Sequence, residues 1–364
     1  MKAKNITARL RSRNASNAIL LILFLLLLLS LMVAVTFGTV PLSLQDVYGV
    51  LYYKAVQLLS GGCAPGNLTA GSALHDVVWL IRLPRLVLGA AVGAALAVSG
   101  VVMQAVVRNP LADPYVLGIS SGASLGATLA TLFGVGAVFG TRSVGAMAFA
   151  GALLVSFAVV FLSNLGGRAT TVKLLLAGAA LSAVCSAFSN FAIYLRNDDN
   201  APAQIIRWTM GGLGAANWPG TFVLLVATIG SVLFFTTQSR VLNLMLLGDD
   251  CAMTLGTDLH NLRILYLAVT SLLIGLSVYN AGTIGFVGLV VPHGVRLLLG
   301  SDHRRLVPTA ALCGAIFLVW ADVACRTLMP GNEIPIGILT SLLGAPVFLV
   351  LMVRHRYGFG GASQ

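Results

Sequence analysis

Apolar runs of roughly twenty residues follow one another along almost the whole chain, and this recurring length limits what the chain can fold into. Charged residues or clusters of glycine and proline separate the runs, which cover residues 18–37, 84–106, 114–133, 144–163, 174–195, 218–236, 263–281, 283–299, 307–326 and 336–353. An α-helix needs about 20 apolar residues to cross the hydrocarbon core of a bilayer. The pattern therefore predicts an all-α polytopic membrane protein with about ten transmembrane helices.

Charge is too scarce in this chain to cover a water-facing surface. Of its 364 residues, 58% are hydrophobic and 9% are charged, whereas about 25% of the residues in a soluble protein are charged. This composition excludes a soluble enzyme, a nucleic-acid-binding domain and a disordered protein. The net charge of +11 is then explained by Lys and Arg in cytoplasmic loops, and no nucleic-acid partner is expected.

The distribution of basic residues orients the chain. With ten spans, 15 Lys and Arg lie in loops on the side of the termini and 7 on the other side. Because cytoplasmic loops are enriched in Lys and Arg, we expect both termini in the cytoplasm. The predicted organisation is a basic cytoplasmic N-terminus (1–17), a membrane domain (18–353) whose first span is not cleaved, and a cytoplasmic tail (354–364).

The two longest loops differ in character. The outer loop, about 38–83, contains several glycines and prolines and is predicted to be irregular. In the inner loop, about 237–262, leucines and methionines alternate with charged residues, and glycines interrupt the pattern. This is typical either of two short amphipathic helices at the membrane surface or of an ordinary interfacial loop.

Acidic residues are nearly missing from the apolar runs. Asp322 is the exception, and Arg326 four residues later can form an ion pair with it on one helix face. Glu333 is the only glutamate and lies outside the runs. Buried carboxylates mark proton and ion pathways, so an ion-coupled carrier is disfavoured. The five cysteines form no C-x-x-C pair, and neither a metal cluster nor a disulfide framework is predicted.

One motif allows an enzymatic and a structural interpretation. Gly118-Ile-Ser-Ser-Gly122 matches the G-x-S-x-G turn that presents a nucleophilic serine, and with His293 it could serve an intramembrane serine protease. Glycines at 118, 122 and 126 also predict a smooth helix face for close packing, which we favour because nothing in the sequence positions a base beside the serine.

Three arginines at the outer ends of apolar runs are likewise open to two interpretations. Arg82 and Arg85 precede the second run, and Arg326 ends the ninth. They either extend to lipid headgroups or bind carboxylates of an acidic partner, for which the planar guanidinium is well suited.

Several segments, in this order, resemble the FecCD-type permeases, the membrane subunits of type II ABC importers for iron-siderophores, haem and cobalamin. They are Arg82-Leu-Pro-Arg85, Val92-Gly-Ala-Ala-Leu-Ala-Val-Ser-Gly100, Arg108-Asn-Pro-Leu-Ala-Asp-Pro114, Trp208-Thr-Met-Gly-Gly212, Gly285-Phe-Val-Gly-Leu-Val-Val-Pro-His293, Glu333-Ile-Pro-Ile-Gly337 and Gly344-Ala-Pro346. The resemblance covers residues 80 to 353 almost without a gap. It implies ten helices per subunit and a dimer that encloses the pathway.

The resemblance also implies roles for particular residues. It assigns Arg82, Arg85 and Arg326 to docking of the substrate-binding protein. The remaining assignments are, for ATPase coupling, Leu247, Gly248, Asp249, Ala252, Leu255 and Gly256, and for the cytoplasmic gate, Asn109, Leu111, Thr170 and Thr171.

The implied function is the permease of an ATP-driven importer for an iron chelate, with cobalamin as the alternative cargo. The implied partners are two cytoplasmic ATPase subunits, which bind the ATP and Mg²⁺, an extracytoplasmic binding protein, and a second permease subunit, a homodimer being favoured. The chain itself is expected to bind no cofactor or metal and to catalyse no reaction. The implied location is the bacterial inner membrane.

The protease and transporter interpretations predict opposite results for one variant. Replacing both Ser120 and Ser121 by alanine removes the only nucleophiles that the motif supplies. We expect the variant to retain transport, because alanine fits a helix face used for packing. Uptake and proteolysis assays on the double variant check this, and a loss of proteolytic activity would establish the protease.

Overall fold

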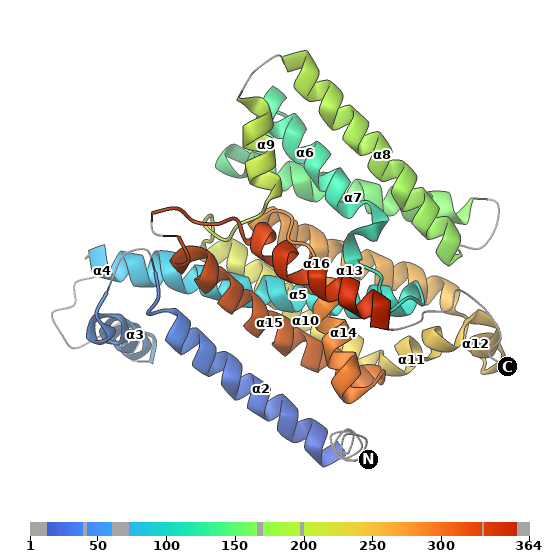
Figure 1. Cartoon of the computed structure of the whole chain (residues 1–364), viewed down its shortest axis with the longest axis horizontal. Coiled ribbons are helices and arrows are strands. Elements are labelled where there is room, and N and C mark those ends of the chain that lie inside the picture. The colour runs from blue at the N-terminus through green and yellow to red at the C-terminus, as the bar shows by residue number, and fades with distance from the viewer. Residues whose placement is uncertain are drawn as a thin grey trace.

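The computed structural model contains helices and connecting segments throughout the part of the chain that it describes (Figure 1). It describes residues 13–38, 42–59, 73–165, 170–196, 200–329 and 331–354. The elements are α2 (Arg13–Ala34), α3 (Leu44–Leu59), α4 (Ala73–Asp76), the π-helix η1 (Val77–Arg82), α5 (Leu83–Val106), the 3₁₀ helix η2 (Pro114–Leu117), α6 (Ile119–Phe133), the 3₁₀ helix η3 (Ala137–Arg142), α7 (Ser143–Asn164), α8 (Thr171–Arg196), α9 (Ala201–Thr209), α10 (Trp218–Thr237), α11 (Ser239–Leu247), α12 (Asp249–Thr254), α13 (Leu259–Ala281), α14 (Val287–Leu299), α15 (His303–Thr327) and α16 (Ile336–Arg354).

The predicted all-α membrane fold is confirmed, and each predicted apolar run corresponds to a helix. Within the described ranges, seven helical segments are long and apolar enough to cross a bilayer, and α6, α14 and α16 provide shorter apolar helices. The break predicted between the seventh and eighth runs occurs at Gly282, whose φ of 67° ends α13. The eighth helix starts at Val287 rather than at residue 283, so residues 283–286 are non-helical backbone between two apolar helices.

Two expectations about the outer side were wrong. The predicted irregular loop 38–83 contains α3, whose first turn is stabilised by a hydrogen bond from the backbone N–H of Asp46 to the Ser43 hydroxyl. The second span also begins earlier than residue 84, because α4, η1 and α5 follow one another without interruption from Ala73 to Val106. The glycines and prolines of this loop favour irregular backbone, and for this reason the shorter helical elements were not predicted.

Helix α5 lies at the centre of the larger helix group and is buried along almost its whole length (Figure 1). Apolar residues occupy every face of α5, as expected for a helix that contacts other helices on every side. Gly93 faces Gly314 of α15, and Gly100 faces Gly288 of α14, so closely that a Cβ on either α5 glycine would overlap the opposing carbonyl group. The absent side chains let the helix backbones touch.

The packing interpretation of the G-x-S-x-G segment is confirmed for Gly122 and Gly126, whereas Gly118, with a φ of 75°, precedes α6 and faces Gly178 and Ser182 of α8. Gly122 and Gly126 face the backbone of α7 at Gly151 and Met147, with no room for a Cβ. Ser120 and His293 line different cavities, so the structure does not bring the two protease candidates together.

Helices α6, α7, α8 and α9 form a second group beside the one built around α5 (Figure 1). Packing between α7 and α13 is the main contact between the two groups. A chain segment that connects the two groups, between α9 and α10, borders one of the cavities described below.

Two glycine-to-alanine variants in helix interiors test the role of close packing. We expect Gly93→Ala to lower the thermal midpoint, because overpacking costs about 1–3 kcal/mol. Gly230 of α10 has open space where a Cβ would lie, so Gly230→Ala should leave the midpoint unchanged or raise it through the better helix propensity of alanine. Melting curves of the purified variants check the difference, and equal midpoints would contradict it.

Candidate functional site

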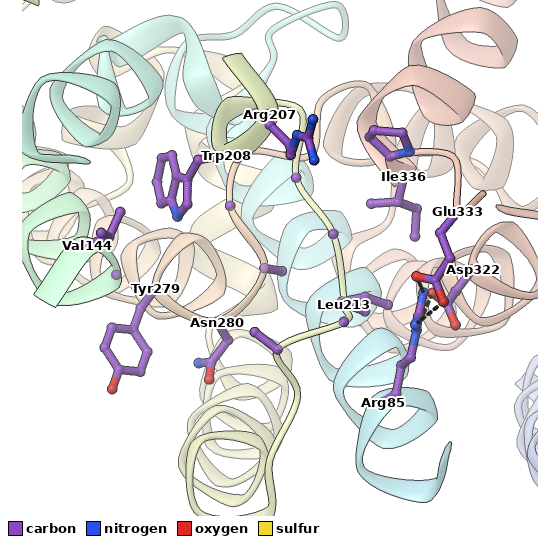
Figure 2. Close-up of a pocket in the computed structure, with 18 of the residues that line it drawn as sticks. Arg85, Val144, Arg207, Trp208, Leu213, Tyr279, Asn280, Asp322, Glu333 and Ile336 are labelled. Carbon is purple, nitrogen blue, oxygen red and sulfur yellow. Dashed lines mark hydrogen bonds and ion pairs between the residues drawn. The ribbon is translucent and has the colours of Figure 1, made fainter. Parts of the chain in front are cut away.

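A largely buried ion-pair network lies at the end of the larger helix group that the sequence predicts to be the outer one. Asp322 of α15 pairs with Arg85 of α5 at 3.0 Å and with Arg326, one turn further along α15, at 3.0 Å. Arg85 also pairs with Glu333, which follows α15, at 2.9 Å (Figure 2). The predicted pair of Asp322 and Arg326 is confirmed. The sequence did not indicate the pairing of Glu333 with Arg85, because 248 residues separate the two.

Two of the three outer arginines hold the end of α2. Arg82 Nη1 donates to the carbonyls of Val35 and Thr36 at 3.0 and 3.1 Å, and Arg326 Nη1 donates to the carbonyl of Phe37 at 3.1 Å. These three carbonyls lie in the turn directly after α2, which ends at Ala34, where no further helical N–H is available to them. The structure thus brings the three predicted docking residues together, with Arg82, Arg85 and Arg326 only 4%, 8% and 6% exposed. Their docking role stays a prediction.

An outer cavity of about 690 Å³ adjoins this network. Its walls come from η3, the start of α7, α9, the glycine-rich segment 211–215, the end of α13 and the segment before α16 (Figure 2). Arg85, Asp322 and Glu333 line one side of it, and Arg142 and Arg207 also line it. Arg142 and Arg207 belong to no motif quoted above, so they were not predicted as site residues.

A larger, mostly apolar cavity of about 980 Å³ lies along α16 and the non-helical backbone at 283–286. Phe286, with a φ of 67°, lines this cavity together with Thr283 and Ser120. Non-helical backbone between apolar helices is tolerated where protein covers it or where it borders a cavity. In the sequence, Gly282 and Gly285 are the small residues that mark this break between two apolar runs.

The six predicted coupling residues form one compact element. Gly248, whose backbone (φ 100°, ψ 167°) suits only glycine, separates α11 from α12, which confirms two short helices in this loop. Ala252 is fully buried, whereas Leu247 and Leu255 are 61% and 64% exposed. Asp249 pairs with Arg263 of α13 at 2.7 Å. The element is therefore fixed to the helix bundle on one side and exposes large apolar side chains on the other.

Asn243 attaches α11 to the start of α15. Its Nδ2 donates to Asp302 at 3.0 Å, and its Oδ1 accepts the backbone N–H of His303 at 3.0 Å. Burial disfavours the charged form of Asp302. The hydrogen bonds from Asn243 and from the Arg304 backbone N–H, with the nearby Arg305 and His303, outweigh that effect and hold the pKa of Asp302 below its ordinary value.

The four predicted gate residues lie in two separate segments with local hydrogen bonds. Asn109 Oδ1 accepts the backbone N–H of Leu111 at 2.9 Å in the turn after α5. Thr170 precedes α8, which starts at Thr171, and its hydroxyl accepts the N–H of Lys173 at 3.3 Å. Helix α8 packs against η2, the element that follows the first turn. The gate role of these four residues stays a prediction.

Comparison with known proteins decides the family. A profile of the FecCD transport family matches residues 24–354. The chain belongs to the FecCD transport family.

Known members and a solved structure resemble this FecCD permease over most of its length. The hemin transport system permease protein HmuU of Yersinia pestis is 42% identical over 292 residues, covering 80% of this chain and 87% of that protein. The vitamin B12 import system permease protein BtuC of Salmonella paratyphi A is 44% identical with the same coverage of 80% and 87%. A structure described as a metal-chelate type ABC transporter in an inward-facing conformation matches with a TM-score of 0.76 and 30% identity, covering 93% of this chain and 100% of the other.

Family membership assigns the general role of the chain. The FecCD permease is a multi-pass membrane subunit of an ABC transporter, and it works with ATPase and other partner subunits. The permease subunit of such a transporter is not itself catalytic.

We predict that Asn243→Ala lowers the thermal midpoint at pH 7, because it removes hydrogen bonds worth about 1 kcal/mol each. The lowered pKa of Asp302 means that its carboxylate stabilises the fold above a pH of about 4 and loses this effect as the pH falls through the lower folded value. The difference between wild type and variant should therefore narrow below a pH of about 4. Melting curves from neutral to acidic pH check this, with Thr237→Ala, which removes an exposed hydroxyl bonded only within its own helix, as the control.

Proposed function

We propose that this FecCD permease forms the translocation pathway of an ATP-driven importer for an iron chelate, either a ferric siderophore or haem. Cobalamin is the alternative cargo. The observation that carries the proposal is the similarity to a hemin permease and a vitamin B12 permease over 80% of this chain. The open, mostly apolar cavity of about 980 Å³ suits a bulky chelate better than a bare metal ion, which would require His and carboxylate ligands.

The proposed assembly contains two copies of the permease, with the pathway at their interface. Two cytoplasmic ATPase subunits bind ATP and Mg²⁺, and an extracytoplasmic binding protein delivers the chelate. The permease itself binds no cofactor and performs no covalent chemistry. It lies in the bacterial inner membrane with both termini in the cytoplasm, as the excess of Lys and Arg in the corresponding loops supports.

The coupling element is suited to contact the ATPase subunits. Leu247 and Leu255 are exposed beside the buried Ala252, and exposed apolar groups on a fixed element are typical of a protein interface. The ion pair between Asp249 and Arg263 would transmit a displacement of this element to α13.

A binding protein that docks on the three arginines must compete with the contacts that they already make within the chain. Arg85 already binds Asp322 and Glu333, and Glu333 is the more exposed of the two carboxylates, with 42% of its side chain accessible. A carboxylate of the binding protein that approaches Arg85 therefore competes with Glu333. Arg82 and Arg326 also hold carbonyls of the α2 terminus, so reversing their charge would disturb the fold as well as docking.

Removing the internal competitor provides a cleaner test of docking. We expect Glu333→Gln to tighten association with the binding protein by up to about fivefold, because a partly exposed ion pair is worth up to about 1 kcal/mol. Arg85→Gln should weaken association. Dissociation constants measured at low and high salt check both variants, since charge pairs are screened by salt.

A matched control separates competition from a general change of charge. Asp46 is an exposed carboxylate of α3 on the predicted outer side, which accepts a hydrogen bond from the Ser43 hydroxyl and is not a member of this network. Asp46→Asn changes the outer charge by the same amount as Glu333→Gln. If both variants tighten association equally, Glu333 does not compete for Arg85.

Purification from the native membrane in mild detergent tests the proposed function as a whole. Proteins that accompany the tagged permease are identified, and their ATPase activity is measured with and without a loaded binding protein. A stoichiometric ATPase stimulated by a binding protein loaded with haem, ferric siderophore or cobalamin supports the importer. Purification of the chain alone in every detergent overturns it.

A further inference from the structure

The outer cavity contains two arginines that the ion-pair network does not use. Arg142 of η3 and Arg207 of α9 both line it. Arg142 donates to the amide oxygen of Asn217 at 2.8 Å. Arg207 is exposed, and in Figure 2 its side chain lies across the cavity from Glu333 and Arg85. Within the described ranges, neither guanidinium forms an ion pair with a carboxylate.

The acidic groups of the same cavity are already neutralised. Asp322 is held by Arg85 and Arg326, and Glu333 is held by Arg85. No carboxylate of the cavity balances the positive charges of Arg142 and Arg207, so the cavity has a net positive charge. A hollow lined by charges of one sign concentrates ligands of the opposite sign.

The remaining walls suit the body of a bulky ligand. The half-buried indole of Trp208 lies next to Arg207 along α9, and the glycine-rich segment 211–215 leaves open space at Gly212 and Gly214. The volume of about 690 Å³ is within the range of small-molecule pockets, about 300–1,000 Å³. Arg207 and Trp208 also line an adjacent hollow of about 560 Å³, so a ligand can reach this pair from two sides.

We propose that Arg142 and Arg207 form an anion subsite that receives the peripheral carboxylates of a bulky, partly apolar chelate on the outer side of the permease. A guanidinium binds a carboxylate through two parallel hydrogen bonds, and an aromatic face beside it accommodates the apolar body. The proposal rests on the importer function and narrows its cargo. An anionic chelate fits this cavity, and a neutral corrinoid gains nothing from the two arginines.

Binding of a chelate with and without its charge tests the subsite. The complete transporter is placed in phosphatidylcholine nanodiscs, and the dissociation constants of hemin and of hemin dimethyl ester are measured. Hemin carries two carboxylates that the ester lacks. We expect the variant with Arg142→Gln and Arg207→Gln to bind hemin about five- to tenfold more weakly and the ester as wild type does.

Two further variants keep the comparison informative. Arg196→Gln removes an exposed arginine at the end of α8 that does not line the cavity, and it should bind both probes as wild type does. Arg207→Gln alone removes a side chain that makes no hydrogen bond within the described chain, so it serves as the test if the double variant is unstable. Equal weakening of both probes, or no weakening of either, overturns the subsite.

Uptake into proteoliposomes separates this proposal from the importer function. ATP-driven uptake of hemin that depends on Arg142 and Arg207 supports both. Uptake of cyanocobalamin without uptake of hemin leaves the importer in place and overturns the anion subsite. Absence of ATP-driven uptake for every chelate overturns the importer itself.

Discussion

The Asp322 carboxylate is buried between two guanidinium groups, and the half of the permease that is predicted to face outward is assembled around it. Only 2% of its side chain is exposed, and a buried charge without a partner would be strongly destabilising. Asp322 therefore requires Arg85 and Arg326 on either side. Arg85 in turn holds Glu333, and Arg326 holds the end of α2. One buried carboxylate thus links the α5 and α15 helices, the end of α2 and the segment that leads to α16.

Close packing through glycine makes this arrangement possible. The backbones of α5 and α15 touch at Gly93 and Gly314, which places Arg85 opposite Asp322 a few turns away. The same principle joins α6 to α7 through Gly122 and Gly126. Helix association inside a membrane relies on such contacts, because burial of apolar surface supplies little driving force there.

Two helices connect the coupling element with the outer network. Helix α15 begins beside Asp302, which Asn243 attaches to α11, and it carries Asp322 and Arg326 near its other end. Helix α13 begins near Arg263, which binds Asp249 of α12, and it ends at the outer cavity with Tyr279 and Asn280. Helices of 25 and 23 residues are about 38 and 35 Å long, so both are long enough to cross the hydrocarbon core of a bilayer. They give the FecCD permease a continuous physical connection between the predicted coupling residues and the ion-pair network.

The sequence by itself determined the fold class, the number and approximate positions of the apolar helices and the pair of Asp322 with Arg326, and it left open whether the loop 237–262 forms two short helices. These depend on local length, period and i,i+4 spacing, which a linear sequence displays directly. Only the tertiary structure decided that Arg82 and Arg326 hold the α2 terminus, that Glu333 binds Arg85, and that Arg142 and Arg207 share a cavity. Each of these contacts joins residues far apart in the chain, and helix packing, which no local pattern encodes, brings them together. The α3 helix was missed for a different reason, because the glycines and prolines around it dominated the local signal.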